Sequence, residues 1–355
     1  MRTHIYYWKC DNPLPVEEKL VYNDKYRLAD ISDLVRKIAI HHFNAEPTFV
    51  EAFGVSGNHY SYRIHYPDQI IFFRSDDGKI DDDYMDAEAA AIKLAREAGV
   101  PVPEVIATDT SKKTFPVRYQ LLENIAGEPM SDLYQAGTLD RTSTATQLGR
   151  FLAQMHQQQL EGFGFFNTET LRNEQKIVGL DSSNEAYFYK RLDDHLRFLQ
   201  DTAFLQPEEV KTVESLFAKH RHHLQLEKGS LVHKDIAYWN LVGTPEEIHA
   251  IIDWDDVISG DPIDDLAIVR CFYQDDVFLP LVEGYSEVRE LPDDFEVRLA
   301  MYLTRNMLWK AVFRTIMKYF EFQEKVDLLN REGEKTLKQF TYERLYQGID
   351  ALKKF

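Results

Sequence analysis

The chain has 355 residues, of which 44% are hydrophobic and 28% are charged, and its formal net charge is −18. This composition is typical of a folded protein of about two domains, and it excludes disordered, collagen-like and low-complexity chains. The negative charge disfavours nucleic acid and anionic membrane surfaces as partners. Two cysteines are too few for a disulfide framework or a cysteine zinc site, and neither an apolar leader nor a run of 18 apolar residues is found. We therefore expect a soluble, cytoplasmic protein with no nucleic-acid or membrane partner.

The first part of the chain predicts a small unit of strands and helices. Residues 1–30 show no clear periodicity, and we treat them as an N-terminal extension. Apolar residues at helical spacing predict a short amphipathic helix from Ile31 to Phe43. Three runs rich in Val, Ile, Tyr and Phe follow, separated by turn residues. They predict an antiparallel meander with strands at Thr48–Phe53, His59–Tyr66 and Gln69–Arg74.

An alanine-rich helix is predicted next, over Tyr84–Ala98. It ends at Gly99 because the Val-Pro-Val-Pro sequence that follows cannot continue a helix. Two further strands are predicted near Glu104–Thr108 and Val117–Asn124. Residues 31–126 are therefore expected to form a first lobe with a five-stranded antiparallel sheet and one prominent helix.

The remainder, residues 127–355, is predicted to be mostly helical. Apolar residues at helical spacing predict helices at Thr142–Gln159, Glu185–Leu199, Pro207–Leu226, Ile263–Tyr273, Phe295–Phe320 and Gly333–Lys353. The exception lies between Ser230 and Asp256, where the short apolar runs Leu231-Val232 and Ile248–Ile252 bracket a polar loop and predict a small β-ribbon. The fold class is thus α+β with two lobes, and the polar loop is where chemistry is expected.

Three polar residues in this region have the spacing that phosphoryl transfer needs. Asp235 and Asn240 lie five residues apart in the loop, and Asp253 follows the second apolar run. Mg²⁺ prefers hard oxygen ligands, which the amide of Asn240 and the carboxylate of Asp253 supply. The remaining carboxylate, Asp235, can orient a substrate hydroxyl and accept its proton. The alternative is ordinary turn chemistry, which is disfavoured because it would require three such residues between buried strands by coincidence.

Three motifs in order resemble those of the aminoglycoside phosphotransferase and choline kinase superfamily. The pattern H-x-D-x-x-x-x-N is met by His233, Asp235 and Asn240, the pattern I-D-W by Ile252–Trp254, and G-D-P-x-x-D-L-A by Gly260–Ala267. The resemblance covers roughly residues 48 to 273. It implies a protein-kinase-like fold with two lobes and transfer of phosphate from ATP, or GTP, with Mg²⁺. It also implies that His233 supports the loop rather than acting in catalysis, and that Asp265 braces it.

The resemblance also implies a nucleotide site in the first lobe. Arg74, at the end of the third strand, matches the residue that holds the α and β phosphates. Glu88, in the alanine-rich helix, matches the glutamate that forms an ion pair with it. Backbone groups of Glu123 and Ile125 match the segment that binds adenine. A loop with only two glycines stands where the phosphates are covered, and its candidate contacts are Ser56, Gly57 and Asn58.

The acceptor is expected to be a small molecule. Only nine residues separate Asp253 from the helix at Ile263, too few for the activation segment with which protein kinases bind their substrates. Five aspartates between Asp255 and Asp265 favour a cationic or amine-bearing acceptor. Aminoglycosides, choline or ethanolamine, homoserine, methylthioribose and amino sugars all stay open.

The competing hypothesis is a catalytically inactive protein of the same fold that binds a nucleotide for a regulatory or structural purpose. Asp235, Asn240, Asp253 and Arg74 are all present, which disfavours this alternative because loss of one of them is its usual sign. The sequence does not decide between a monomer and a homodimer.

Overall fold

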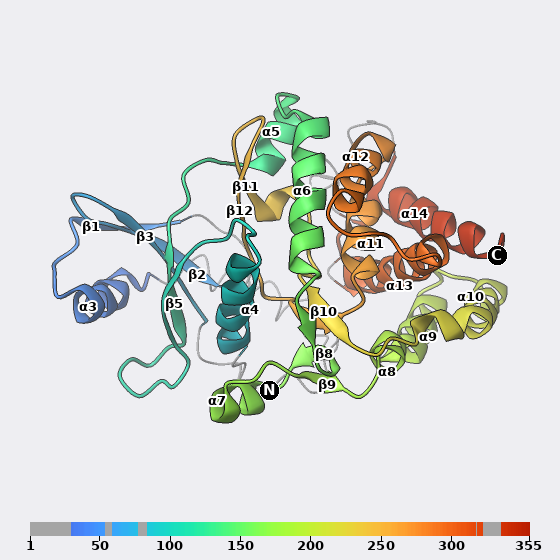
Figure 1. Cartoon of the computed structure of the whole chain (residues 1–355), viewed down its shortest axis with the longest axis horizontal. Helices are drawn as coiled ribbons and strands as arrows, with labels where there is room; N and C mark the ends of the chain where they lie inside the picture. Colours follow the sequence, from blue (N-terminus) through green and yellow to red (C-terminus); the bar gives the residue numbers. More distant parts are fainter. Residues whose placement is uncertain (1–29, 54–58, 77–83, 317, 322–334) are drawn as a thin grey trace.

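The computed structural model describes residues 30–53, 59–76, 84–316, 318–321 and 335–355. Nearly all of the predicted N-terminal extension, residues 1–30, lies outside these ranges. Figure 1 shows two lobes, with the smaller one at the left. Its five-stranded antiparallel sheet has the order β1 (Phe49–Ala52), β2 (Tyr60–His65), β3 (Ile70–Ser75), β5 (Tyr119–Glu123) and β4 (Val105–Asp109). The predicted sheet is therefore confirmed, each strand within about two residues of its expected bounds.

The smaller lobe has its own core between the sheet and α3 (Ser32–Phe43). Alternate residues of β2, Tyr60, Tyr62 and Ile64, are buried, as expected for a strand with one face on a core. They share a cluster with Val35 and Ile38 of α3. The alternation in the sequence thus fixes which face of the sheet is covered.

Helix α4 (Met85–Glu97) contributes to the larger core and also contacts β4 of the sheet. Ala87, Ala91 and Ala95 are fully buried along one face, four residues apart, which matches helical periodicity. At the start of the helix, the Tyr84 hydroxyl donates a hydrogen bond to the carbonyl of Val257 in the second lobe. This helix therefore connects the two lobes and lies beside the place where they meet (Figure 1).

The second lobe is mostly helical, as predicted, but it also holds two small sheets. One has the order β7 (Gln159–Leu160), β10 (Gly229–Val232), β13 (Ile258–Gly260), β8 (Phe163–Phe166) and β9 (Gly179–Asp181). The other has the order β12 (Ile248–Ile251), β11 (Leu241–Gly243) and β6 (Glu128–Pro129). The helices are α5 (Met130–Ala136), α6 (Arg141–Met155), α7 (Thr168–Glu174), α8 (Asn184–Tyr189), α9 (Leu192–Asp201), α10 (Pro207–His220), α11 (Ile263–Phe272), α12 (Asp275–Ser286), α13 (Phe295–Ile316) and α14 (Leu337–Leu352), with 3₁₀ turns η1 (Arg221–Leu224) and η2 (Tyr238–Asn240).

Several boundaries in the second lobe differ from the prediction. The helix expected over Glu185–Leu199 is two helices, α8 and α9, because Arg191 adopts a left-handed conformation with φ of 60° between them. The helix expected to reach Gln159 ends at Met155, since Gln159 pairs with Ser230 in the β7–β10 ladder. Helix α12, which holds a proline inside it, was not predicted. Tertiary contacts outweigh local periodicity at each of these places.

Helix α13 is buried along most of its length and packs against α9, α11 and α14. Its buried residues include four cationic side chains, which sequence periodicity does not explain: Arg298, Arg305, Lys310 and Arg314. Among the helices that the structure describes, none has both the length and the apolar character needed to cross a membrane.

Candidate active site

The Asp235 loop, residues 233–240, follows β10 and is anchored by a buried carboxylate of α11. Asp265 accepts hydrogen bonds from the backbone N–H groups of His233, at 2.8 Å, and Lys234, at 2.7 Å. Its Oδ2 atom also lies 3.1 Å from Nε2 of His156, the residue that follows α6. Burial alone would raise the pKa of Asp265, but these partners lower the pKa below its usual value. Asp265 therefore holds the loop backbone as an ionised carboxylate, in the bracing position predicted for it.

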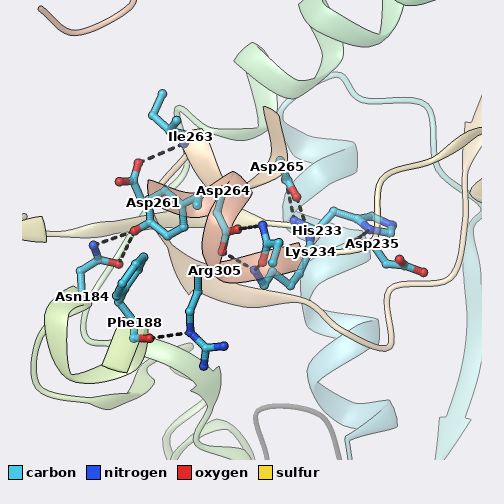
Figure 2. A network of polar contacts seen from close by, with 12 residues as sticks. Asn184, Phe188, His233, Lys234, Asp235, Asp261, Ile263, Asp264, Asp265 and Arg305 are labelled. Atoms are coloured by element: carbon cyan, nitrogen blue, oxygen red, sulfur yellow. Dashed lines mark hydrogen bonds and ion pairs between the residues drawn. The ribbon is translucent and has the colours of Figure 1, made fainter. Parts of the chain in front are cut away.

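The loop turns sharply at Lys234, which has φ of 73°. The Lys234 ammonium points into the lobe, 2.5 Å from Oδ2 of Asp264 and 2.8 Å from Oδ1 of Asn306. Figure 2 shows this network and shows the side chain of Asp235, the next residue, on its outer side. The turn thus anchors one side chain inside and leaves its neighbour, Asp235, clear of the network.

His233 joins the loop to the segment that carries Asp253. Its Nε2 atom lies 3.0 Å from the carbonyl of Ile252, and its Nδ1 atom accepts a bond from the Asp235 N–H at 3.3 Å. The ring packs 4.7 Å from that of Trp254 and is fully buried. Both ring nitrogens are therefore used to hold backbone, which fits the supporting role expected of His233.

Asn240 lies directly beside Asp235. Its Nδ2 atom donates to the carbonyl oxygen of Asp235 at 2.7 Å and to its Oδ2 atom at 2.9 Å. Because the amide nitrogen is used in this way, the amide oxygen is the atom left for a ligand. The Asp253 carboxylate is half exposed and lines the same cavity as Asn240. These two oxygen donors fit Mg²⁺, which is usually held by one or two protein ligands together with phosphates and water.

The first lobe contributes an ion pair on the side of the site opposite the Asp235 loop. Nη1 of Arg74, on β3, lies 2.9 Å from Oε2 of Glu88, on α4, so the predicted pair is present. The same nitrogen lies 3.8 Å from Oδ1 of Asp253. Both Arg74 and Glu88 are buried. Residues from β3, α4 and the segment after β12 therefore meet at one point between the lobes.

A cavity of about 270 Å³ lies at this meeting point. Its charged end holds Arg74, Asn240 and Asp253, and it is also lined by Glu123 and Ile125, two of the residues matched to adenine binding. Apolar side chains cover much of the rest: Phe53, Phe72, Ile92, Leu122, Val242 and Ile252. An apolar slot that ends in a cation and two oxygen donors has the shape and chemistry of a nucleotide site. The predicted loop contacts Ser56, Gly57 and Asn58 lie outside the described residues.

Sequence reasoning missed His59, which lines this cavity just before β2. The side chain is partly buried, and neither of its buried ring nitrogens has a hydrogen-bond partner among the described residues. Oδ2 of Asp255 lies 3.9 Å from Nε2. Burial, with the charge of Arg74, lowers the pKa of His59, so the ring is neutral at pH 7. Its position beside the loop expected to cover the phosphates was the available signal.

The acidic run after Asp253 is not the open negative surface that its sequence indicates. Asp261 is buried and bonded to Nε of Arg298 at 2.9 Å. Asp264 and Asp265 are buried in the network of Figure 2. Of the five aspartates between Asp255 and Asp265, only the first two keep partial exposure.

Comparison with known proteins supports a single family. The model of the phosphotransferase enzyme family matches residues 55–298. No curated protein sequence matches the chain. A thermostable mutant of aminoglycoside phosphotransferase APH(4)-Ia, in a ternary complex with AMP-PNP and hygromycin B, has a TM-score of 0.61 at 15% identity, over 89% of this chain and 98% of the other.

Two further solved structures share the fold. A putative fructosamine-3-kinase from Haemophilus somnus 129PT gives a TM-score of 0.56 at 16% identity, over 88% of this chain and 96% of that protein. Spectinomycin phosphotransferase APH(9)-Ia, in complex with ADP and spectinomycin, gives 0.52 at 16% identity, over 90% and 97%. The family match spans more than half of the chain, and the fold and the cavity agree with it. The chain therefore belongs to the phosphotransferase enzyme family and is a small-molecule phosphotransferase.

Proposed function

We propose that this protein transfers the γ-phosphoryl group of Mg²⁺-bound ATP to a hydroxyl group of a small molecule. The observation that carries the proposal is the meeting of the Asp235–Asn240 pair, Asp253 and the Arg74–Glu88 ion pair between the lobes. Phosphoryl transfer depends mainly on positioning and on charge stabilisation. This set offers a carboxylate for the acceptor, oxygen donors for a metal and a fixed cation for the phosphates.

The nucleotide would lie in the cavity between the lobes. Arg74, oriented by Glu88, would bind the α and β phosphates, and the backbone near Glu123 and Ile125 would bind the adenine. The presence of AMP-PNP and of ADP in structures of similar fold supports an adenine nucleotide. GTP is the alternative nucleotide, and measuring the Kd of ATP and of GTP directly would distinguish the two.

The reaction forms a bond between the acceptor oxygen and the γ phosphorus and breaks the bond from that phosphorus to the β–γ bridging oxygen. The Asp235 carboxylate accepts the hydroxyl proton, and ADP leaves. Asn240 keeps Asp235 in place through its two hydrogen bonds. Asn240 and Asp253 would hold Mg²⁺, which when bound neutralises charge on the phosphate oxygens.

The acceptor is a small molecule, for which hygromycin B and spectinomycin in similar structures offer two examples of size. The prediction of a cationic or amine-bearing acceptor stays a prediction. Fewer aspartates support it than the sequence suggested. Asp261, Asp264 and Asp265 are buried and bonded to other groups, and of the five only Asp255 and Asp256 are partly exposed.

Two variants test the division of roles. Asp235→Ala should lower kcat by about 10²-fold to 10⁴-fold, the usual contribution of a general base, with little change in the Kd of Mg-ATP. Asp253→Ala should instead weaken Mg-ATP binding, measured by calorimetry. Asp350→Ala, at an exposed position in α14, is the matched control. Equal loss of nucleotide binding in Asp235→Ala and Asp253→Ala would contradict the assignment, and tight Mg-ATP binding without transfer to any acceptor would favour the inactive alternative.

A further inference from the structure

The ammonium group of Lys310 is buried, and no counter-ion from the described residues is bonded to it. Lys310 lies on α13, and only 6% of its surface is exposed. Its Nζ atom lies 4.3 Å from the ring centre of Phe272 and 5.2 Å from that of Trp309. No carboxylate or hydrogen-bond acceptor among the residues that the structure describes is bonded to it. The aromatic faces stabilise the cation only in part.

A second buried cation follows one turn later. Arg314 is 5% exposed, and its one hydrogen bond within the described part of the chain is from Nη1 to Oγ1 of Thr341, at 2.6 Å. Residues four apart lie on the same face of a helix, so Lys310 and Arg314 repel each other. Buried cations elsewhere in this lobe are balanced differently, as Arg298 by Asp261 and Lys234 by Asp264.

Within the described ranges no carboxylate is bonded to either cation, and a buried cation without such a partner is physically unfavourable. Burial lowers the pKa of Arg314 to about 10, and it also lowers the pKa of Lys310, with partial compensation from Cys271 and Asp235. A buried charge is normally paired, because removal from water costs more than a neutral contact returns. An anionic ligand group would supply the missing charge.

The position of Lys310 places that ligand beside the transfer site. The carboxylate of Asp235 is among the charges that act on Lys310. Trp239 lines the nucleotide cavity, and its ring packs edge-on against Phe272 with 4.6 Å between the centres. Phe272 is the same ring that Lys310 covers. The lysine therefore lies behind the wall formed by Trp239 and Phe272, on the Asp235 side of the nucleotide cavity.

We propose that the acceptor carries an anionic group, a carboxylate or a phosphate, which Lys310 binds with Arg314 behind it while Asp235 acts on the hydroxyl. This inference rests on the proposed function and narrows its substrate class. An amine-bearing acceptor satisfies it only if the molecule also carries an anion, as a hydroxylated amino acid does. Purely cationic amino alcohols do not.

The first test measures turnover over a panel of hydroxyl compounds. Hydroxylated carboxylic acids, their uncharged amides, sugar phosphates, neutral sugars and amino alcohols are each offered with Mg-ATP, and ADP release is followed. We expect the acids or the sugar phosphates to be used, and the matched neutral compounds to have kcat/KM lower by about tenfold to 100-fold, the range expected for a hydrogen bond to a charged group. Comparison of the hydroxylated carboxylic acids with the sugar phosphates shows whether the anionic group is a carboxylate or a phosphate.

The second test uses three variants. Lys310→Met should raise the KM for the anionic acceptor by a similar factor, abolish the preference for acid over amide, and leave the Kd of Mg-ATP unchanged. Lys310→Arg should restore part of the preference. Lys335→Met, at a half-exposed surface position, is the matched control and should behave as wild type.

Stability without any acceptor gives a readout independent of turnover. Because no counter-ion in the described part of the chain is bonded to Lys310, Lys310→Met should keep or raise the Tm. Loss of a lysine with a purely structural role would lower it. A clear fall in the Tm of Lys310→Met, or a rise in its Kd for Mg-ATP, would overturn the proposal. So would a preference of the wild-type protein for amino alcohols or neutral sugars. Absence of turnover with every compound, while Mg-ATP binds normally, would overturn it as well. Failure of the wild-type protein to bind Mg-ATP would instead refute the proposed function.

Discussion

Replacement of Asp265 by asparagine is the sharpest test of how the Asp235 loop is held. Both carboxylate oxygens are in use, since they accept the N–H groups of His233 and Lys234 at 2.8 and 2.7 Å. Asparagine has one acceptor oxygen, so one of these buried N–H groups must face the amide NH₂ instead. An unpaired buried donor costs about 1–3 kcal/mol. The substitution also removes the ionised carboxylate that His156 contacts. Together, the two effects should lower the free energy of unfolding by about 3–5 kcal/mol.

The effect on catalysis should exceed what the loss of stability explains. A backbone shift of about 1 Å in the loop would displace Asp235 from the acceptor hydroxyl and can lower the rate about 10²-fold. The matched control is Asp264→Asn, which also removes a buried carboxylate from the first turn of α11. Asp264 bonds to side chains, Lys234 and Asn306, and to no backbone N–H of the loop among the described residues.

The two variants are compared by urea denaturation and by turnover at a temperature where both are folded. Both should be less stable than wild type, but only Asp265→Asn should show the 10²-fold fall in kcat and faster hydrogen exchange at the amides of His233 and Lys234. An equal fall in kcat for both variants would mean that the network as a whole, rather than the backbone bonds of Asp265, positions the loop.

Three further outcomes are expected. Glu88→Gln keeps the shape of the side chain but removes the charge that orients Arg74, so the Kd of Mg-ATP should rise about tenfold by calorimetry, a loss of about 1.4 kcal/mol, and an unchanged Kd would contradict that role. Gly149→Ala would place a methyl group against the backbone of α12. The free energy of unfolding, measured by urea denaturation, should therefore fall by about 1–3 kcal/mol. Wild-type stability of this variant would mean that α6 and α12 separate easily. Burial beside Arg305 lowers the pKa of His195 to about 2, so between pH 6.5 and 5 the unfolded chain binds a proton that the folded chain does not. Stability should therefore fall by about 2 kcal/mol over that interval, and His195→Gln should remove this part of the pH dependence.

The first lobe was predictable because its order is local. In β2 the alternation of Tyr60, Tyr62 and Ile64 with polar residues specifies one buried face, and the structure buries these three residues. The second lobe was less predictable where tertiary contacts outweigh periodicity. At Arg191 the chain enters a left-handed turn and divides one predicted helix into two, and α12 forms despite Pro280.

The candidate site was also predictable in part. Motif spacing identified Asp235, Asn240 and Asp253, and the structure places the first two 2.9 Å apart, with the third lining the same cavity as Asn240. The roles assigned to them stay proposals. Sequence reasoning passed over His59 although it follows the loop expected to cover the phosphates, because its place in the site depends on a cavity that residues of both lobes line.

The sequence by itself determined the order of the elements in the first lobe, the spacing of the motifs and the family that they resemble, since each depends on neighbours along the chain. Tertiary structure alone decided where the charge lies. Asp261 is balanced by Arg298, 37 residues away, and Asp264 by Lys234, 30 residues away, while Asn306 adds a hydrogen bond to Asp264. A net charge counts side chains, but the field at a site depends on which of them are buried and paired, and that is fixed only when distant segments pack.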